Sequence, residues 1–445
     1  MTTVTFHPAR LHGSALVPPA KSEAHRALLL AALGRGDCRL HGFPPPLCDD
    51  TQAMINGVTA MGASVVHEAD TLLVHPAPPA VAGAPMAACD VHACAAALRM
   101  LIPAFLVRGQ AVRFTMEPAL FARPLDAFEP LLEVIGGTMV RTPATDGRPA
   151  AVELSGVMRA GSYEVDGSRS SQFASGLLIA LSKATDPLGR PAPSRLTIGR
   201  PIVSRPYLDM TLRLMETFGA PYAEKEEGVF DIEPHGKASP GDVPISGDWS
   251  QGAVLLCANA LGCGVMIGNL CGGAPGTECL QGDARVLDVL SQMGLRLYRT
   301  HGELYAVSPS RPGLMPVRLD CSDIPDLAPI LALTCTQARG TSTLSGVSRL
   351  RLKECDRLSA TVGLLGKLGA HAEISADGDV LTIVGPTPLH GGFEADALHD
   401  HRMVMLLAVA ALSCDAPITV HGAEALHKSW PGFLDTYRAL GGKIS

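Results

Sequence analysis

Six segments of the chain are strongly apolar, and each changes its pattern part of the way along. A run that is apolar on every side is followed by a turn of small or basic residues and then by a β-type stretch. Because a helix that is apolar all round must be buried, we expect these helices inside the fold and the strands outside them. The six segments are residues 27–40, 100–114, 174–198, 253–267, 328–344 and 403–420.

A second pattern recurs between the apolar segments with a nearly constant period. A helix-like stretch ends in an apolar residue, a glycine follows, and a short strand begins. These glycines are Gly62, Gly136, Gly219, Gly294, Gly369 and Gly441, and successive ones are 72 to 83 residues apart. A period this regular indicates a repeat architecture of six units, each with two helices and several strands.

The last unit is shorter than the others, because the chain ends at Ser445 soon after Gly441. Residues 2–7 alternate between polar and apolar positions as a strand does, so we expect them to supply the strand that this unit lacks. Three units then form one domain from 21 to 245, and three form another from 246 to 445 together with 1–20. Two chain crossings would join the domains, which is the geometry of a hinged cleft.

The composition narrows the class of protein. With 47% apolar and 18% charged residues, the chain is typical of a compact globular protein. Its net charge of −7 argues against nucleic acid as a partner, so an anionic ligand would have to be held by local cations.

The spacing of the cysteines and the length of the apolar runs indicate in which cellular compartment the protein is expected. The twelve cysteines include no C-x-x-C pair, which favours core thiols in a reducing, cytoplasmic compartment over a metal site. The N-terminus carries no signal-sequence pattern, and the apolar run that begins at Met403 is about half a membrane span. We therefore expect no membrane insertion, and we take the protein as a monomer by default.

Basic residues gather at the borders of the apolar segments. The densest stretch, residues 349–357, reads Arg-Leu-Arg-Leu-Lys-Glu-Cys-Asp-Arg and precedes a helix-like segment. It is either a solvated first turn, whose carboxylates complement the helix dipole, or part of an anion pocket. Other isolated cations at such borders favour the pocket, and they are Lys21, Arg26, Arg123, Arg402 and Lys428.

Hydroxyl and carboxylate groups also precede predicted helices. Lys21 with Ser22, the group Ser170, Ser171 and Gln172, and Ser204 are each either helix caps or parts of an anion site. Residues 320–326 place three carboxylates ahead of another helix. One of them is a candidate general base toward a hydroxyl, and capping of the helix by Asp323 is the alternative.

Two motifs resemble those of the 5-enolpyruvylshikimate-3-phosphate synthase family of enolpyruvyl transferases. Residues 353–358 read Lys-Glu-Cys-Asp-Arg-Leu and resemble the family's K-E-T-D-R-L, and residues 400–405 read Asp-His-Arg-Met-Val-Met and resemble its D-H-R-M-A-M. The similarity extends over essentially the whole chain. It implies the family's α/β fold, a two-domain inside-out α/β barrel in which each domain has three βαβαββ units with buried helices and outer sheets.

The resemblance also implies a reaction. The enolpyruvyl group would pass from phosphoenolpyruvate to the 5-hydroxyl of shikimate 3-phosphate, a step of the shikimate pathway to chorismate and the aromatic amino acids, with no metal or organic cofactor. It implies that Asp326 accepts the hydroxyl proton and that Glu354 and Lys21 serve proton transfer at the enol carbon. The implied shikimate 3-phosphate residues are Lys21, Ser22, Arg26, Ser170, Ser171, Gln172, Ser204, Asp326 and Lys353. The implied phosphoenolpyruvate residues are Lys21, Ala95, Arg123, Gln172, Arg357, Arg402 and Lys428.

One loop departs from the family pattern. Where the family reads N-A-G-T-A-x-R, residues 93–99 read Ala-Cys-Ala-Ala-Ala-Leu-Arg, so Ala95 replaces a glycine and Ala96 a threonine. The added methyl of Ala95 predicts a narrower pocket and weaker binding of phosphoenolpyruvate and of its competitor glyphosate.

Three alternatives stay open from the sequence. The first is the sister enzyme that acts on UDP-N-acetylglucosamine, although residues 115–122 lack the cysteine common in that group. The second is a non-catalytic paralogue that binds a phosphorylated metabolite. The third is an enzyme of the same family with a different acceptor.

Overall fold

The computed structural model describes residues 2–81, 83–234, 236, 239–271, 279–300, 303–307 and 313–445. The chain divides into two compact units. Unit 1 comprises Met1–Pro18 and Ser246–Ser445, and unit 2 comprises Pro19–Ile245. The predicted domain 21–245 therefore starts two residues after the start of unit 2.

Unit 2 contains seven α-helices among its described residues and three four-stranded sheets. The helices are α1 (Lys21–Ala32), α2 (Asp49–Ala60), α3 (Ala95–Arg108), α4 (Pro118–Phe121), α5 (Glu129–Ile135), α6 (Ser171–Leu181) and α7 (Arg205–Thr217). The first sheet has, in spatial order, the strands β14 (Asp242–Pro244), β3 (Cys38–His41), β5 (Thr71–His75) and β4 (Ser64–Glu68). The second has β6 (Ala87–Asp90), β7 (Val112–Met116), β9 (Ala150–Ser155) and β8 (Thr138–Thr142). The third has β10 (Ser162–Asp166), β11 (Ser194–Gly199), β13 (Val229–Ile232) and β12 (Tyr222–Glu226).

Unit 1 repeats this arrangement. Its described α-helices are α8 (Trp249–Ala260), α9 (Val286–Gln292), α10 (Ala328–Cys335), α11 (Arg357–Lys367), α12 (His401–Ala411) and α13 (Phe433–Ala439). Its first sheet has, in spatial order, the strands β2 (His12–Leu16), β15 (Gly264–Gly268), β17 (Glu303–Val307) and β16 (Arg296–Thr300). The second has β18 (Arg318–Asp320), β19 (Gly340–Ser345), β21 (Val380–Gly385) and β20 (His371–Ile374). The third has β22 (Phe393–Asp396), β23 (Ile418–His421), β1 (Thr3–His7) and β24 (Lys443–Ile444).

All six sheets have one topology. In each sheet the first two strands of the spatial order pair parallel, and the two remaining strands extend the sheet antiparallel. A helix connects the two parallel strands in four of the sheets, whereas β2 and β15, and β14 and β3, come from distant parts of the chain. Each repeat is thus a βαβαββ unit, and the predicted fold class is confirmed. In the last repeat the N-terminal strand β1 pairs with β23 and β24, so this sheet joins both ends of the chain.

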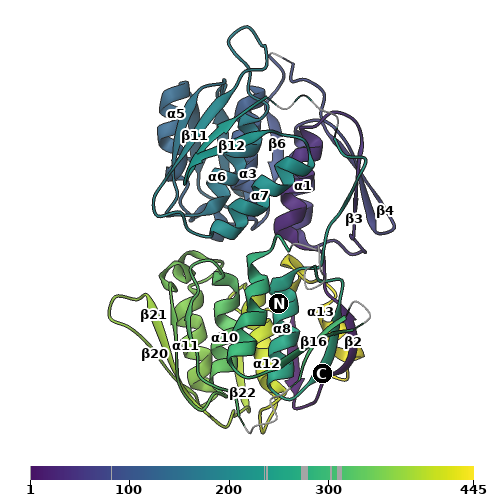
Figure 1. Cartoon of the computed structure of the whole chain (residues 1–445), viewed down its shortest axis with the longest axis vertical. Coiled ribbons are helices and arrows are strands. Elements are labelled where there is room, and N and C mark those ends of the chain that lie inside the picture. Colours follow the sequence, from purple (N-terminus) through teal and green to yellow (C-terminus); the bar gives the residue numbers. More distant parts are fainter. Residues whose placement is uncertain are drawn as a thin grey trace. The chain divides into compact units, whose positions relative to one another are not determined.

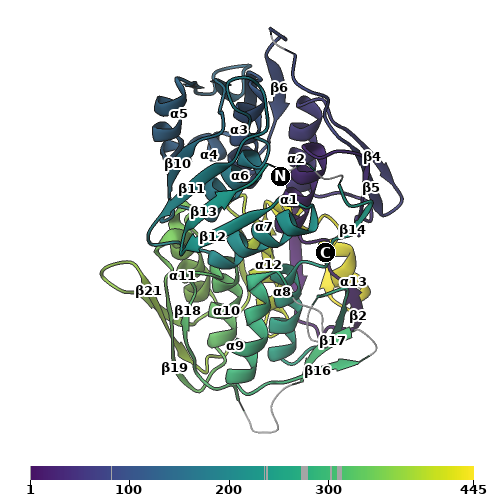
Figure 2. The same cartoon turned by 45° about the horizontal axis from the view of Figure 1, so that its top comes forward.

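Buried helices form the centre of each unit. In unit 1 every residue of α8, α10 and α12 is buried, and these helices pack against one another with the strands outside them (Figure 1). In unit 2, α6 packs between α3 and α7, and β3 (Figure 1) and β4 and β5 (Figure 2) lie on the outside. The apolar runs of the sequence, such as the one that begins at Met403, have no polar face because no side of these helices meets solvent.

The periodic glycines end the second helix of each repeat. Gly62, Gly136, Gly219, Gly294, Gly369 and Gly441 all have positive φ, between 61° and 100°. A residue with a Cβ is strained in this conformation, so glycine lets the chain leave the helix and turn into the next strand. The constant period of the sequence therefore reflects one backbone requirement that recurs in every unit.

Candidate active site

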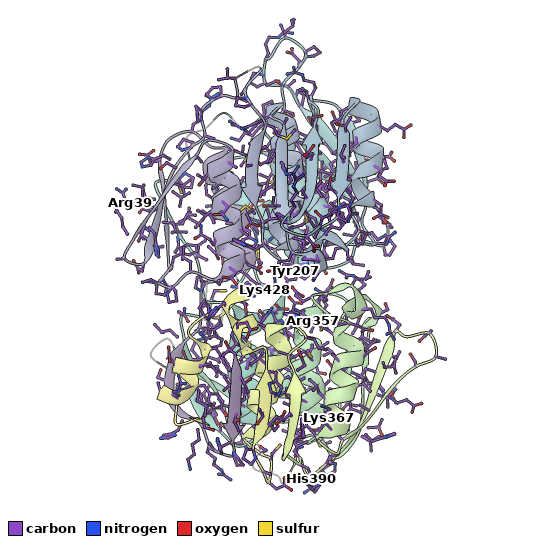
Figure 3. The ribbon with its side chains drawn as sticks, turned by 180° about the vertical axis from the view of Figure 1, so that it is seen from behind. Arg39, Tyr207, Arg357, Lys367, His390 and Lys428 are labelled. Atoms are coloured by element: carbon purple, nitrogen blue, oxygen red, sulfur yellow. The ribbon has the colours of Figure 1, made fainter. Side chains whose placement is uncertain are left out.

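One end of unit 1 gathers charged side chains from four different segments. They come from the 3-10 helices η3 (Pro325–Leu327) and η5 (Ala423–Lys428), from residues 353–357 that lead into α11, and from the start of α12. Figure 3 labels Arg357 and Lys428 at this end, whereas Lys367 and His390 lie toward the opposite end of the unit. We call this group of residues the unit 1 cluster, and its members are Asp326, Lys353, Glu354, Arg357, Asp400, Arg402 and Lys428.

Helix caps place two of the cluster's segments. The Asp356 carboxylate accepts a hydrogen bond from the backbone N–H of Ser359 at 3.0 Å and so starts α11 at Arg357. The Asp400 carboxylate accepts from the backbone N–H of Arg402 at 2.9 Å and starts α12. The solvated-turn interpretation was therefore correct for Asp356, while its neighbour Glu354 turns to Arg357.

Arg357 is the centre of the unit 1 cluster and is almost fully buried. Its guanidinium donates to Asp326 at 2.7 Å, to Glu354 at 2.7 Å and to Asp400 at 2.6 Å. Burial alone would lower the pKa of Arg357, but the charges of Asp400, Glu354 and Asp326 raise it well above its usual value. This guanidinium therefore acts as a constant positive charge at the centre of the cluster.

Asp326 is shared by three cations. Its carboxylate accepts from Lys353 at 3.1 Å and from Arg357, and it lies 3.5 Å from a guanidinium nitrogen of Arg402. Burial would raise the pKa of Asp326, but these positive charges hold it well below its usual value. The N-cap residues of η3 and α10 are Ile324 and Leu327, and neither makes a side-chain cap.

Arg402 has a buried donor left over. Its two terminal nitrogens donate to the backbone carbonyl and the hydroxyl of Ser250 at 3.3 and 2.9 Å. Its Nε is buried and has no hydrogen-bond partner among the described residues, and the same holds for both amide atoms of Gln251. An unpaired buried N–H of a cation costs free energy unless an acceptor reaches it, so this position suits an anion.

Lys428 is the last member of the unit 1 cluster. The Lys428 ammonium lies 3.7 Å from Glu354 and is 8% exposed. The cluster thus contains four cations and three carboxylates, and its net positive charge is what an anion site requires.

Two contributors to the unit 1 cluster were missed by the sequence interpretation. Asp400 is the partner of Arg357, and Ser250 holds Arg402 from the start of α8. The only local signal for Ser250 was its place after the helix cap Asp248, because a cap marks a helix start without saying what it faces.

In unit 2, Lys21 and Ser22 begin α1, which has no side-chain cap. The Lys21 ammonium pairs with Asp50 at 2.8 Å, and the Asp50 carbonyl contacts the ring of His25 at 2.8 Å. Burial, the largest effect, lowers the pKa of His25 to about 4, so the imidazole is neutral at pH 7. Asp50 was not among the predicted site residues.

Arg26 joins three helices of unit 2. Its guanidinium donates to Thr211 at 2.6 Å and to the carbonyl of Tyr207 at 3.0 Å, both in α7, and to Ser175 of α6 at 3.1 Å. It also donates to the carbonyl of Ser22 in its own helix at 2.6 Å. Tyr207, labelled in Figure 3, lies in the first turn of α7, so Arg26 ties the starts of α1 and α7 to α6.

The predicted hydroxyl residues lie at two of these helix starts. Ser170 caps α6 by accepting from the backbone N–H of Gln172, and Ser171 is the first residue of that helix. Ser204 precedes α7 with a φ of 55°, an unusual conformation for a residue other than glycine. Capping was one of the two alternatives for Ser170, and it is confirmed.

A bridge through Arg99 links further predicted residues. Arg99 donates to the side-chain oxygen of Gln172 at 3.0 Å and to the carbonyl of Pro124 at 3.4 Å. Pro124 follows Arg123, whose own carbonyl accepts from Arg141 at 3.4 Å. Arg99, from the end of the altered loop, was not predicted as a site residue.

The altered loop runs directly into α3. Cys94 caps the helix by accepting from the backbone N–H of Ala97, and Ala95 is the first helical residue and 6% exposed. The methyl group of Ala95 is therefore packed within unit 2 rather than held out in solvent.

Three findings concern ligands and membranes. A cavity of about 410 Å³ in unit 2 is lined by Asp126, Glu164, Asp166 and Arg169 with smaller residues. Among the described residues no group of three or more His, Cys, Asp or Glu side chains could hold a metal ion. In the same part of the chain no helix has both the length and the apolar character needed to span a bilayer.

Comparisons with known proteins place the chain in a family. The EPSP synthase (3-phosphoshikimate 1-carboxyvinyltransferase) family matches residues 6–437. The chain is 31% identical to the 3-phosphoshikimate 1-carboxyvinyltransferase of Clostridioides difficile and 32% identical to that of Clostridium botulinum Eklund 17B. Each alignment covers 100% of this chain and 98% of the relative.

Solved structures share the fold. EPSP synthase from Acinetobacter baumannii superposes with a TM-score of 0.75 at 23% identity, and both chains are covered completely. The enolpyruvyl transferase NikO from Streptomyces tendae gives a TM-score of 0.72 at 19% identity, over 100% of this chain and 98% of the other. These two likenesses show the fold alone.

Proposed function

The chain belongs to the EPSP synthase family, and on this premise we propose that it transfers the enolpyruvyl group of phosphoenolpyruvate to the 5-hydroxyl of shikimate 3-phosphate. The products are 5-enolpyruvylshikimate 3-phosphate and inorganic phosphate. The family match favours this acceptor over UDP-N-acetylglucosamine, which defines the sister enzyme.

The proposal assigns the predicted residues by the substrate that they serve. Shikimate 3-phosphate is held by Lys21, Ser22, Arg26, Ser170, Ser171, Gln172, Ser204, Asp326 and Lys353. Phosphoenolpyruvate is held by Lys21, Ala95, Arg123, Gln172, Arg357, Arg402 and Lys428. Asp326, Glu354 and Lys21 are the catalytic residues in this assignment.

The proposed reaction proceeds by addition and elimination. A proton adds to the methylene carbon of phosphoenolpyruvate, with Glu354 and Lys21 as the groups for this transfer, and the neighbouring carbon becomes electrophilic. The 5-hydroxyl oxygen bonds to that carbon and gives its proton to Asp326. Loss of phosphate and of a methyl proton from the tetrahedral adduct then restores the double bond.

The unit 1 cluster is the observation that carries the proposal. Both substrates are anions, and positioned cations offset the repulsion between them and the charge that develops in the adduct. Arg402 supports the assignment most directly, because its buried Nε has no partner among the described residues and an anionic oxygen would supply one.

Phosphate release tests the proposal. The purified protein with phosphoenolpyruvate should release phosphate when shikimate 3-phosphate is added and should release none with UDP-N-acetylglucosamine. The Asp326→Ala variant serves as the control for contaminating phosphatase and should be inactive. The proposal would be overturned if neither acceptor caused phosphate release, or if only UDP-N-acetylglucosamine did.

Location and assembly are further parts of the proposal. All twelve cysteines are free thiols, which suits a reducing compartment, so we place the protein in the cytoplasm. We also propose that it acts as a monomer, without nucleic acid or membrane partners, and size-exclusion chromatography with light scattering measures this directly.

A further inference from the structure

Arg169 connects two segments of unit 2 that are distant in the sequence. It lies in the serine loop, residues 168–172, which runs into the first turn of α6. Its guanidinium pairs with Asp126 of η1 (Asp126–Phe128) at 3.0 Å and lies 3.7 Å from Asp166 at the end of β10. Asp166 in turn accepts from the backbone N–H and the hydroxyl of Ser168 at 2.8 and 2.9 Å. The loop is therefore fixed by carboxylates at its start and through Arg169.

Two more contacts join the same segments. Arg99 bridges the side chain of Gln172 and the carbonyl of Pro124, as described above. The rings of Phe128 and Phe173 pack edge to face with their centroids 4.9 Å apart. The segment 123–128 is thus fastened to the segment 169–173 by an ion pair, a hydrogen-bonded bridge and an aromatic contact.

We propose that Arg169 is a positioning residue that couples binding of the two substrates. The inference rests on the proposed function, which assigns Ser170, Ser171 and Gln172 to the acceptor and Arg123 to the donor. When a substrate restricts the motion of one segment, 123–128 or 169–173, the Arg169–Asp126 pair also restricts the motion of the other. A substrate that orders the first segment thereby lowers the entropy cost of binding the second.

An arginine in a serine loop invites a simpler interpretation, in which it binds the substrate's phosphate directly. Its contacts oppose this, because the guanidinium is engaged by the carboxylates of Asp126 and Asp166 and leaves the serines to meet the ligand. Arg169 and Asp126 are each 45% exposed, so their pair contributes little to the stability of the fold. Its effect should therefore appear in substrate binding rather than in thermal stability.

A double-mutant cycle tests the coupling. The variants are R169A, D126A and the double variant, with R169K as the conservative replacement. For each, the dissociation constant of shikimate 3-phosphate is measured by calorimetry with and without glyphosate, and the ratio of the two values is the coupling factor. We expect R169A and D126A each to reduce this factor at least about fivefold, the double variant to do no more than either, and R169K to retain most of it. The melting temperature and kcat should stay close to those of the wild type.

A matched pair on the same unit provides the control. Arg195 and Asp231 form a two-bonded pair at 2.6 and 3.0 Å on β11 and β13, and Arg195 is 51% exposed, close to the exposure of Arg169. R195A should leave the coupling factor unchanged. An intact coupling factor in R169A would overturn the inference, and so would its loss in R169A but not in D126A, which would make Arg169 a direct phosphate ligand. A wild type that binds the ligands but turns over neither acceptor would refute the proposed function, and the inference with it.

Discussion

Replacement of Asp326 by asparagine separates the proposed chemistry from the architecture of the unit 1 cluster. Asparagine keeps the shape of the side chain and one acceptor oxygen, but it carries no charge and cannot take a proton from a hydroxyl. Arg357 retains Glu354 and Asp400 as partners, so the cluster should stay assembled. The variant therefore tests the proton acceptor with little structural change.

The expected changes in kcat, KM and unfolding free energy follow from the role and the exposure of Asp326. Loss of a general base lowers kcat by about 10² to 10⁴, or about 3 to 5 kcal/mol in the barrier. Four cations then face two carboxylates instead of three, so the KM for phosphoenolpyruvate should stay equal or fall. Asp326 is 24% exposed, so the loss of unfolding free energy should be about 1 to 2 kcal/mol, less than for a fully buried pair.

Steady-state kinetics and urea unfolding measure these quantities. Asp320→Asn is the matched control, because Asp320 ends β18 six residues before Asp326, is exposed, and accepts only a local backbone hydrogen bond from Ser322 among the contacts described for it. We expect its kcat to equal that of the wild type. The reasoning is refuted if Asp326→Asn keeps kcat within tenfold of the wild type, or if it raises the KM for phosphoenolpyruvate while kcat is unchanged.

Three further predictions follow from the caps and the altered loop. Asp400→Asn keeps the cap of α12 but removes the charge opposite Arg357, so urea denaturation should show a loss of about 2 kcal/mol, and a loss below about 0.5 kcal/mol would contradict this. Burial would raise the pKa of Asp356, but the hydrogen bonds from Ser359 and the charge of Arg351 lower it below its usual value. The ionised Asp356 therefore adds to the free energy of unfolding above about pH 4, and this contribution is lost as the pH falls through the lowered pKa. Between pH 7 and pH 3 the urea midpoint of the wild type should therefore fall more steeply than that of Asp356→Asn, and parallel curves would exclude this role. Ala95→Gly and Ala96→Thr should lower the KM for phosphoenolpyruvate and strengthen inhibition by glyphosate, and unchanged constants in both variants would discard the narrow-pocket interpretation.

Much of the fold could be predicted because its determinants are local. A helix such as α12 is buried on all sides and must be apolar all round, and each repeat must reverse direction at a glycine with positive φ, so both features recur visibly in the sequence. The pairing of charged side chains is not local. Arg357 meets Asp400 at a separation of 43 residues, and Arg26 meets Thr211 at 185, and no periodicity in the chain specifies such partners.

The site residues therefore depended on a different source of information. Charge at the borders of apolar segments made Lys353, Arg402 and Lys428 candidates for an anion pocket, with a solvated helix start as the alternative for the stretch around Lys353. The resemblance to a family supplied the proposed roles, and the structure supplied the partners.

The surroundings of Asp326 pose a requirement that the proposed mechanism has to meet. A proton acceptor works best when its pKa is near the working pH, yet Lys353, Arg402 and Arg357 hold the pKa of Asp326 well below its usual value against the opposing effect of burial. The same three cations are the ones assigned to the substrates. When anionic oxygens bind to them, the positive charge acting on Asp326 is partly neutralised, while its burial remains. In the proposed mechanism its pKa should therefore rise on substrate binding, which would make the carboxylate a stronger base once the substrates are in place. In this mechanism the carboxylates would keep the cations ordered before binding, and strong basicity is expected only when the hydroxyl to be deprotonated is present.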